Sequence, residues 1–262
     1  MKFQQIKINL ITFFLIGLSF LYGQENNTEN KNELANKIQN PVADLVQLPF
    51  QNNTTFYNDE VSNSLNIQPV TPFSIKNKFN IILRSIFPIV TNPFVNETGL
   101  GNVSLSAFFT PKVPKKIIWG IGPAIQFGAN KNFGLERSSI APSGVALYQK
   151  DGWTFGGLFQ NFFGLGSSSS KPDVNFFYTQ IFITKNLPKG WYVNTSPIIT
   201  YNWEAKNDDG LTLPLGGGFG RLFRLGKLPI NASLGYYRFI EHPQNANDLL
   251  RIQLKLILPK FY

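Results

Sequence analysis

The stretch GWYVNTSPIITYNWE, residues Gly190–Glu204, alternates between two kinds of side chain. Its odd positions from Trp191 to Trp203 are mostly apolar or aromatic, whereas its even positions from Asn194 onward are mostly polar. Successive residues of a β-strand point to opposite faces, so one face of this strand suits lipid and the other suits water. About twelve residues at about 3.3 Å each, tilted by about 40°, span about 30 Å, which is the thickness of the hydrocarbon layer of a membrane. The stretch therefore predicts a strand of a transmembrane β-barrel.

The composition of the chain agrees with a barrel wall. Of 262 residues, 43% are hydrophobic, which is ordinary for a globular protein, but aromatic residues reach 15% and charged residues only 15%. A soluble domain carries about 25% charged residues. Alternation dilutes the apolar residues of a barrel, so a mean hydropathy of −0.08 does not argue against a membrane location.

Several kinds of chemistry are excluded or disfavoured by residue counts. The chain has no cysteine, which excludes disulfides and thiolate metal sites, and it has one histidine. Its net charge is +9, but the lysines and arginines are spread along the chain without a nucleic-acid motif. We therefore expect no nucleic-acid partner. The excess of positive charge is interpreted as contacts to lipid phosphates or to anions in a lumen.

The N-terminal residues predict a secreted chain. Lys2 and Lys7 precede an apolar run from Ile8 to Tyr22, and Gly23 comes just before a polar stretch. This pattern predicts a signal peptide over residues 1–23, with a membrane anchor as the alternative. Residues 24–40 are rich in Asn and Glu and predict a flexible periplasmic leader. Residues 41–262 are assigned to the barrel.

The remaining chain reads as strand, turn, strand almost without interruption. The alternating runs are about ten residues long, longer than the roughly five or six residues of strands in a soluble sandwich. They predict an all-β, transmembrane antiparallel β-barrel of about twelve strands, or ten if the run Phe50–Tyr57 and a shorter hairpin are left out. Prolines within these runs, such as Pro197 and Pro214, predict bulges or unpaired positions in the wall.

Several sequence runs resemble a known protein family. They include NPVADLVQLPFQNNTTF (Asn40–Phe56), WGIGP (Trp119–Pro123), the stretch from Gly190 to Glu204 and PLGGGFG (Pro214–Gly220). These runs are similar to bacterial outer-membrane proteins grouped with the "MetA-pathway of phenol degradation" proteins, which are transporter-like and sometimes labelled neuromedin U. The resemblance implies a location in the bacterial outer membrane and passage of small aromatic or hydrophobic compounds. The final Phe261-Tyr262 is similar to the aromatic signature that the barrel-assembly machinery reads, so this machinery and outer-membrane lipid are the expected partners.

The sequence contains no convincing catalytic, cofactor-binding or metal-binding motif. The run GGGFG, residues Gly216–Gly220, fits no phosphate-binding pattern, and His242 has no nucleophile motif nearby. No cofactor is expected. The polar faces of the strands supply candidates for a lumen lining: Arg84, Asn194, Asn202, Glu204, Arg251, Gln253 and Lys255. Aromatic residues at the ends of the apolar faces predict a girdle at the membrane interfaces: Trp119, Trp153, Trp191, Tyr201 and Trp203.

The expected function is passive passage or binding of small solutes, among them aromatic or hydrophobic ones, by a protein that is not an enzyme. Two alternatives stay open. The first is a structural or adhesive barrel with a blocked lumen. The second is an outer-membrane enzyme that modifies lipids.

Overall fold

The structure is a computed structural model that describes residues 28–75, 78–113, 116–166, 171–206 and 209–259. The predicted signal peptide and the terminal Phe261-Tyr262 lie outside these ranges. The chain divides into two units, residues 1–31 and residues 32–262, and the second unit is the barrel described below. No helix among the described residues is long and apolar enough to cross a membrane.

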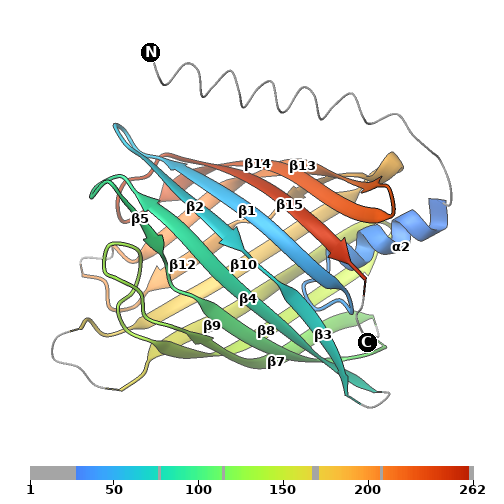
Figure 1. Ribbon diagram of the computed structural model, residues 1–262, viewed down its shortest axis with the longest axis horizontal. Coiled ribbons are helices and arrows are strands. Elements are labelled where there is room, and N and C mark those ends of the chain that lie inside the picture. Colours follow the sequence, from blue (N-terminus) through green and yellow to red (C-terminus); the bar gives the residue numbers. More distant parts are fainter. Residues whose placement is uncertain (1–27, 76–77, 114–115, 167–170, 207–208, 260–262) are drawn as a thin grey trace. The chain divides into compact units, whose positions relative to one another are not determined.

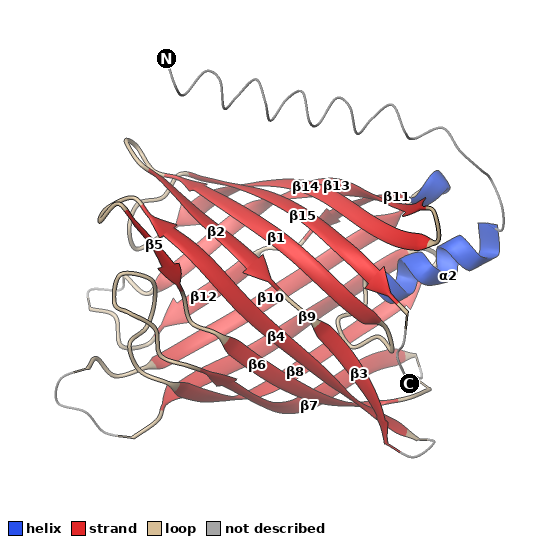
Figure 2. Cartoon of the chain, in the orientation of Figure 1, coloured by secondary structure: helices blue, strands red, loops and turns tan. Residues whose placement is uncertain are grey.

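The second unit is a closed antiparallel β-barrel (Figures 1 and 2). The described elements are α2 (Thr28–Ile38), which belongs to this unit from Asn32 onward, β1 (Val46–Phe56), β2 (Val61–Ile67), β3 (Val70–Ile75), β4 (Phe79–Asn92), β5 (Glu97–Leu100), β6 (Ser104–Pro111), β7 (Ile117–Gln126), β8 (Ser139–Lys150), β9 (Trp153–Gly164), β10 (Asn175–Asn186), a 3₁₀ turn (Pro188–Gly190), β11 (Trp191–Thr195), β12 (Ile198–Asn202), β13 (Leu211–Leu225), β14 (Leu228–Glu241) and β15 (Asp248–Leu258).

Pairing of the first strand with the last closes the sheet. β1 pairs with β15 over its whole length, from Val46 opposite Leu258 to Phe56 opposite Asp248. β2 and β3 continue each other along one position of the wall, as do β11 and β12, and β5 extends only the end of β4. The wall therefore has twelve strands, which confirms the predicted fold class. Such a ring leaves no sheet edge exposed to lipid.

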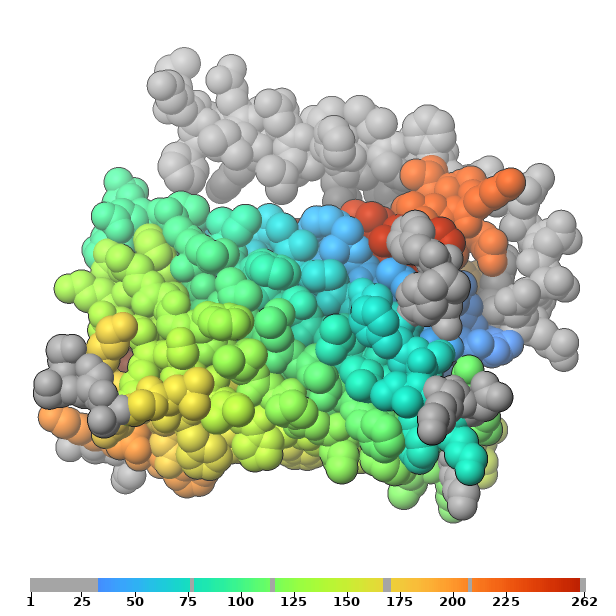
Figure 3. All heavy atoms as spheres, turned by 60° about the horizontal axis from the view of Figure 1, so that its bottom comes forward, coloured from blue at the N-terminus to red at the C-terminus, as the bar shows by residue number. Residues whose placement is uncertain are grey.

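The predicted alternation is visible in the exposure of neighbouring side chains. In β15, Ile252 and Leu254 are each 42% exposed, whereas Arg251 on the opposite face of the same strand is 7% exposed. In β7, Trp119 and Ile121 face outward while Gly120 is buried. Figure 3 shows the continuous layer of side chains that covers the outside of the wall. An apolar exterior on a closed barrel places this protein in a membrane, and barrels of this kind belong to the bacterial outer membrane.

Two prolines coincide with irregularities of the wall: the pairing of β13 with β14 shifts register at Pro214, and one strand is divided at Pro197. The predicted continuous strand from Trp191 to Trp203 is divided at Ser196-Pro197 into β11 and β12. Both pieces keep one register on β10, but pairing with β13 stops at Asn194 opposite Gly218 and resumes only at Thr200. Proline has no N–H group and so removes one donor from the ladder, although the register continues past other prolines of the wall, such as Pro123 opposite Pro142.

The two ends of the barrel differ in the length of their connections. Connections of at most five residues join β3 to β4, β6 to β7, β8 to β9, β10 to β11 and β13 to β14, and we call this the short-turn end. Longer connections, such as residues 127–138 between β7 and β8, form the long-loop end. At the turn between β8 and β9, Asp151 and Gly152 both adopt positive φ angles of 51° and 77°, as a two-residue hairpin requires.

The predicted flexible leader contains a helix. Residues 24–40 include α2 (Thr28–Ile38), and the barrel wall begins at Val46 rather than directly after Asn40. Within the barrel unit, Ile38 and Val42 are almost completely buried. The helix is stabilised by tertiary contacts: the carbonyl oxygen of Asn36 accepts a hydrogen bond from Gln149 and that of Ile38 accepts one from Lys255. These carbonyls lie at the C-terminal end of the helix and have no partner within the helix itself. Their partners come from distant strands, so the polar composition of residues 24–40 could not predict that the helix would form.

The interior of the barrel is apolar on one side. Val42 packs against a buried cluster of residues that point inward from β3, β4, β6, β8 and β9: Val70, Ile82, Phe108, Val145, Leu147 and Leu158. The N-terminal segment therefore forms a packed core with this part of the barrel interior. Polar inward-facing residues collect on the opposite side, along β1, β14 and β15.

Replacing an outward-facing residue by a charge tests the position of the membrane. Leu254→Arg places a cation in the middle of the β15 exterior, where we expect it to lower the free energy of unfolding by about 2–4 kcal/mol. Leu225→Arg, beside the turn between β13 and β14, is expected to cost about 1 kcal/mol or less because the interface is close. Urea unfolding in lipid vesicles measures both values, and equal losses would contradict the proposed membrane position.

Candidate functional site

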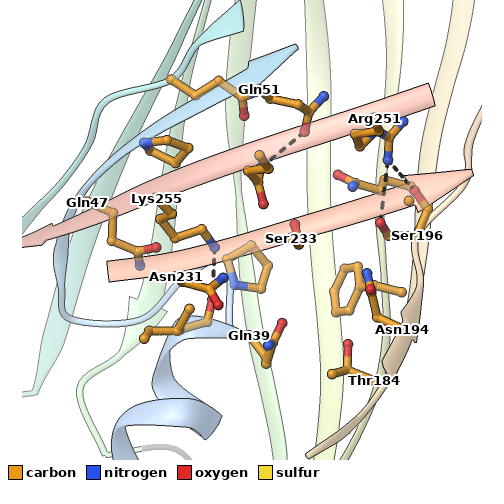
Figure 4. Close-up of a pocket in the computed structure, with 18 of the residues that line it drawn as sticks. Gln39, Gln47, Gln51, Thr184, Asn194, Ser196, Asn231, Ser233, Arg251 and Lys255 are labelled. Carbon is orange, nitrogen blue, oxygen red and sulfur yellow. Dashed lines mark hydrogen bonds between the residues drawn. The ribbon is translucent and has the colours of Figure 1, made fainter. Parts of the chain in front are cut away.

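A polar cavity of about 150 Å³ lies inside the barrel. Its walls are side chains from β1, β4, β10, β11, β14 and β15, and residues 38–41 after α2 form its boundary toward the short-turn end. Figure 4 shows Lys255 and Arg251 of β15, Asn194 of β11 and Ser196 of the following break around this shared space. Most inward positions on these strands are polar, and Val70 and Leu158 of the apolar cluster border the same space.

Lys255 lies at the floor of the cavity, beside the helix. Its Nζ atom donates a hydrogen bond to the carbonyl oxygen of Ile38 at 3.1 Å. A cation at the C-terminus of a helix satisfies a free carbonyl and interacts favourably with the helix dipole. Lys255 therefore holds the N-terminal segment in the lumen, while its charge is directed into the cavity.

Arg251 lies further along β15, opposite the break between β11 and β12. Its Nη1 atom donates to the backbone oxygen of Ser196 at 2.8 Å, and its Nε atom donates to Oδ1 of Asn53 at 3.0 Å. The guanidinium also lies over the ring of Tyr237, 4.9 Å from the ring centre. The hydroxyl of Tyr237 accepts a hydrogen bond from the backbone nitrogen of Ser196 at 3.2 Å. These two inward side chains satisfy the backbone groups that the proline break leaves unpaired.

The cavity has a positive electrostatic character. Arg84 on β4 adds a third cation, and its Nη2 atom donates to Oε1 of Gln68 at 3.0 Å. The side chains that line the cavity in the described part of the chain include these three cations and no aspartate or glutamate. The hydrogen-bond partners of these cations are neutral oxygens, so no carboxylate of the described lining compensates their charge and the field of the cavity favours anions.

Neutral amides fill the space between the cations. Gln253 donates to Oε1 of Gln51 at 3.2 Å across the junction between β15 and β1, and Gln47 follows on the same face of β1. Asn231 donates to the hydroxyl of Tyr192 at 3.1 Å, and its own Oδ1 atom is buried without a hydrogen-bond partner in the structure. Amide and hydroxyl groups can exchange their hydrogen bonds with water or with a solute, so this lining suits polar ligands.

Five of the seven residues that the sequence proposed as a lumen lining lie together at this cavity. They are Arg84, Asn194, Arg251, Gln253 and Lys255. Asn202 and Glu204 do not line it. Asn202 is at the end of β12, where its Oδ1 atom accepts a hydrogen bond from the backbone of Glu204, and Glu204 is exposed in the following loop.

The sequence analysis did not identify several residues of the site. Gln47, Gln51 and Asn53 lie on the same face of β1, and this spacing alone would have predicted that they line the lumen. Tyr237 and residues 38–41 had no such signal, because a tyrosine on a strand is equally suited to the membrane interface, and the helix was expected to be flexible.

The proposed aromatic girdle divides between the two ends of the barrel. Trp119, Trp153 and Trp191 lie near the short-turn end and are each 37–40% exposed. Tyr201 and the 57% exposed Trp203 lie at the long-loop end, where their ring centres are 4.6 Å apart.

The single histidine lies away from the cavity, in the connection between β14 and β15. His242 packs edge to face on Tyr57 and Phe239, with ring centres 6.0 and 4.8 Å apart. Its Nδ1 atom accepts a hydrogen bond from the backbone nitrogen of Gln244 at 3.1 Å. Burial among these rings lowers the pKa of His242 below 6.5. Among the described residues, no three His, Asp or Glu side chains gather as metal ligands.

Comparison with solved structures supports the fold assignment. The chain is similar to the COG4313 outer membrane channel from Pseudomonas putida F1, with 14% sequence identity and a TM-score of 0.62 over 82% of this chain and 94% of that chain. It is also similar to the NanC porin, with 8% identity and a TM-score of 0.54 over 82% of this chain and all of that chain. Outer membrane phospholipase A from Escherichia coli matches with 11% identity and a TM-score of 0.46, over 88% of this chain and 99% of that chain.

The comparisons with known families and with curated proteins gave no match. The grouping with the MetA-pathway proteins therefore stays a prediction from the sequence. What the similar structures show is the fold, an outer-membrane-type barrel.

Removing the hydroxyl of Tyr237 tests whether its hydrogen bond with Ser196 stabilises the backbone at the strand break. Tyr237→Phe deletes the acceptor of the Ser196 amide and leaves the ring under Arg251 in place. A hydrogen bond of about 0.5–1.5 kcal/mol corresponds to about two- to tenfold faster hydrogen exchange at this amide. Tyr148→Phe, on a strand without such a break, should leave the Ser196 exchange rate unchanged. Unchanged exchange in Tyr237→Phe would show that the contact does not hold the strand.

The environment of His242 predicts a pH dependence of the long-loop end. Because the folded-state pKa lies below the unfolded value of about 6.5, the neutral ring is favoured in the folded protein. Its contribution to stability is present above that value and is lost as the pH falls through the folded pKa. NMR titration should give a pKa below 6.5 for His242, and a value at or above 6.5 would contradict the packing. Tyr57→Ala should move the pKa upward because it removes part of the burial.

Proposed function

We propose that this protein is a passive channel of the bacterial outer membrane that prefers small anionic solutes. The observation that carries this proposal is the cavity with Arg84, Arg251 and Lys255 and no acidic side chain in its described lining. Charged rings that line a pore select solutes by sign, because an ion of opposite charge enters at lower free energy. The similar barrels named as a channel and as a porin agree with this role.

The preferred solute is a small organic anion with a short apolar or aromatic body. Three rings, those of Phe182, Tyr192 and Tyr237, share the cavity with the cations. A carboxylate can accept hydrogen bonds from a guanidinium in a bidentate geometry, and an apolar body gains from contact with the rings. This proposal retains the aromatic solutes expected from the sequence and adds a negative charge.

We further propose that the chain has no catalytic role. His242 lies in a loop where aromatic rings and a backbone amide surround it, and the general base of a lipid-modifying enzyme would need a nucleophile within hydrogen-bond reach. Insertion by the barrel-assembly machinery and contact with outer-membrane lipid remain part of the proposal for partners.

A blocked lumen is the second candidate, because one observation favours it. Residues 38–43 lie inside the barrel, and Val42 packs into the apolar cluster that fills one side of the interior. A segment held in this way narrows the path toward the short-turn end. The same barrel would then need to release the segment before a solute could pass.

Planar-bilayer recordings test the sign preference. The wild-type protein should pass chloride more readily than potassium, as the reversal potential in a salt gradient shows. The triple variant Arg84→Gln, Arg251→Gln and Lys255→Gln should lose this preference, with a permeability ratio that falls several-fold toward unity. Lys189→Gln, an exposed cation outside the cavity, should retain it. Cation preference in the wild type would refute the proposal.

A deletion separates the channel from the blocked barrel. A variant without residues 33–43 loses the helix end and Val42, so its conductance should exceed that of the wild type if the segment narrows the path. If the wild type does not conduct and the deletion variant does, the result would support the blocked lumen. Equal conductance of the two proteins would show that the segment does not obstruct the path.

A further inference from the structure

The outer surface at the short-turn end is strongly cationic. The described turns and strand ends there carry nine lysine and arginine residues: Lys78, Lys112, Lys116, Lys150, Lys185, Lys189, Arg221, Arg224 and Lys227. Asp151 is the one acidic residue in the same described turns, and it lies 4.0 Å from Lys150. We call this set of nine cations the basic rim.

The long-loop end has the opposite balance. Its described connections and strand ends carry nine acidic residues: Asp59, Glu60, Glu97, Glu136, Asp173, Glu204, Asp209, Glu241 and Asp248. They carry five basic residues: Lys131, Arg137, Lys171, Lys206 and Arg238. Among the described turns, loops and strand ends, the positive charge is therefore concentrated at the short-turn end. A general need for solubility would not produce such a separation.

Three cations of the basic rim lie over aromatic rings of the outer wall. Lys185 lies over Trp153 at 5.0 Å from the ring centre, and Arg221 lies over Trp191 at 5.2 Å. Lys116 lies over Tyr148 at 5.9 Å. These pairs come from separate parts of the wall, namely β7 with β8, β9 with β10, and β11 with β13.

Such a pair matches the chemistry of a lipid headgroup. The aromatic ring lies at the border between hydrocarbon and water, and the cation extends along it toward the polar layer. The ring restricts the position of the cation without neutralising its charge, which leaves the charge available for an anionic phosphate. Lys185 is fixed further, because its Nζ atom donates to the backbone oxygen of Asp151 at 2.9 Å.

We propose that the basic rim binds anionic phospholipid headgroups of the leaflet at the short-turn end. The juxtaposition of three cation–ring pairs and six further cations at one membrane border carries this inference. It concerns the outside of the wall and goes beyond passage of solutes through the lumen. Short turns of outer-membrane barrels face the periplasm, so the lipid is that of the periplasmic leaflet.

Lipid retention measures this interaction directly. The full-length protein is reconstituted in vesicles of phosphatidylcholine mixed with phosphatidylglycerol, extracted in mild detergent and examined by native mass spectrometry. The wild type should retain phosphatidylglycerol in preference to phosphatidylcholine. The rim variant Lys116→Gln, Lys185→Gln and Arg221→Gln should retain less, by about fivefold for each cation that contributes fully. Added salt should weaken the preference of the wild type.

A charge-matched control distinguishes the rim from net charge. The variant Lys131→Gln, Lys206→Gln and Arg238→Gln removes two lysines and one arginine from the long-loop end, so its net charge equals that of the rim variant. It should keep the preference for phosphatidylglycerol. Heat-dependent gel migration checks that each variant has formed its barrel, and a rim variant that does not fold is replaced by the single variants Lys185→Gln and Arg221→Gln.

Two results would overturn the proposal: a wild type that retains both lipids equally, or equal losses in the two triple variants. The chloride preference of the channel in neutral bilayers should be the same in the rim variant and the wild type. A change in that preference together with unchanged lipid retention would assign the rim to the solute path and not to lipid.

Discussion

The fold depends on the pairing of β1 with β15. Lipid offers no hydrogen-bond partner, so each backbone N–H and C=O group within the membrane must be satisfied by the protein. The pairing from Val46 opposite Leu258 to Phe56 opposite Asp248 converts a twisted sheet with two edges into a ring without an edge. The outward residues can then be apolar along the whole circumference. A lumen also becomes available, because closure separates an inner face from lipid.

The same constraint explains the polar groups inside the barrel. Where Pro197 breaks the strand, the backbone of Ser196 turns to Tyr237 and Arg251 for its hydrogen bonds. Where α2 ends, Lys255 donates a hydrogen bond to the carbonyl oxygen of Ile38. Each of these cations is bound through a neutral oxygen, so its structural contact leaves its charge uncompensated. The stability of the barrel and the positive field of its cavity therefore rest on the same side chains, and a variant that changes one will change the other.

The barrel is divided in two ways that a simple cylinder would not require. Across the lumen, an apolar cluster around Val42 faces a polar cavity along β1, β14 and β15. Along the axis, a basic rim at the short turns faces an acidic set of loops. For the proposed channel, the first division leaves one side of the interior as the path of a solute. The second underlies the proposed lipid binding, because phosphate headgroups are attracted to cations and repelled by carboxylates.

The sequence by itself determined the barrel, its outward and inward faces and most of the charged residues at the cavity. Alternation with a period of two is a local property, so Arg251, Gln253 and Lys255 could be assigned to the inner face of one strand before any pairing was known. The tertiary structure decided what lies opposite each face. The helix α2, the packed side of the lumen and the position of Glu204 outside the cavity all depend on contacts between residues far apart in the chain. Such contacts are set by closure of the sheet and by the tilt of its strands, which depend on the whole wall and not on the neighbouring residues in the sequence.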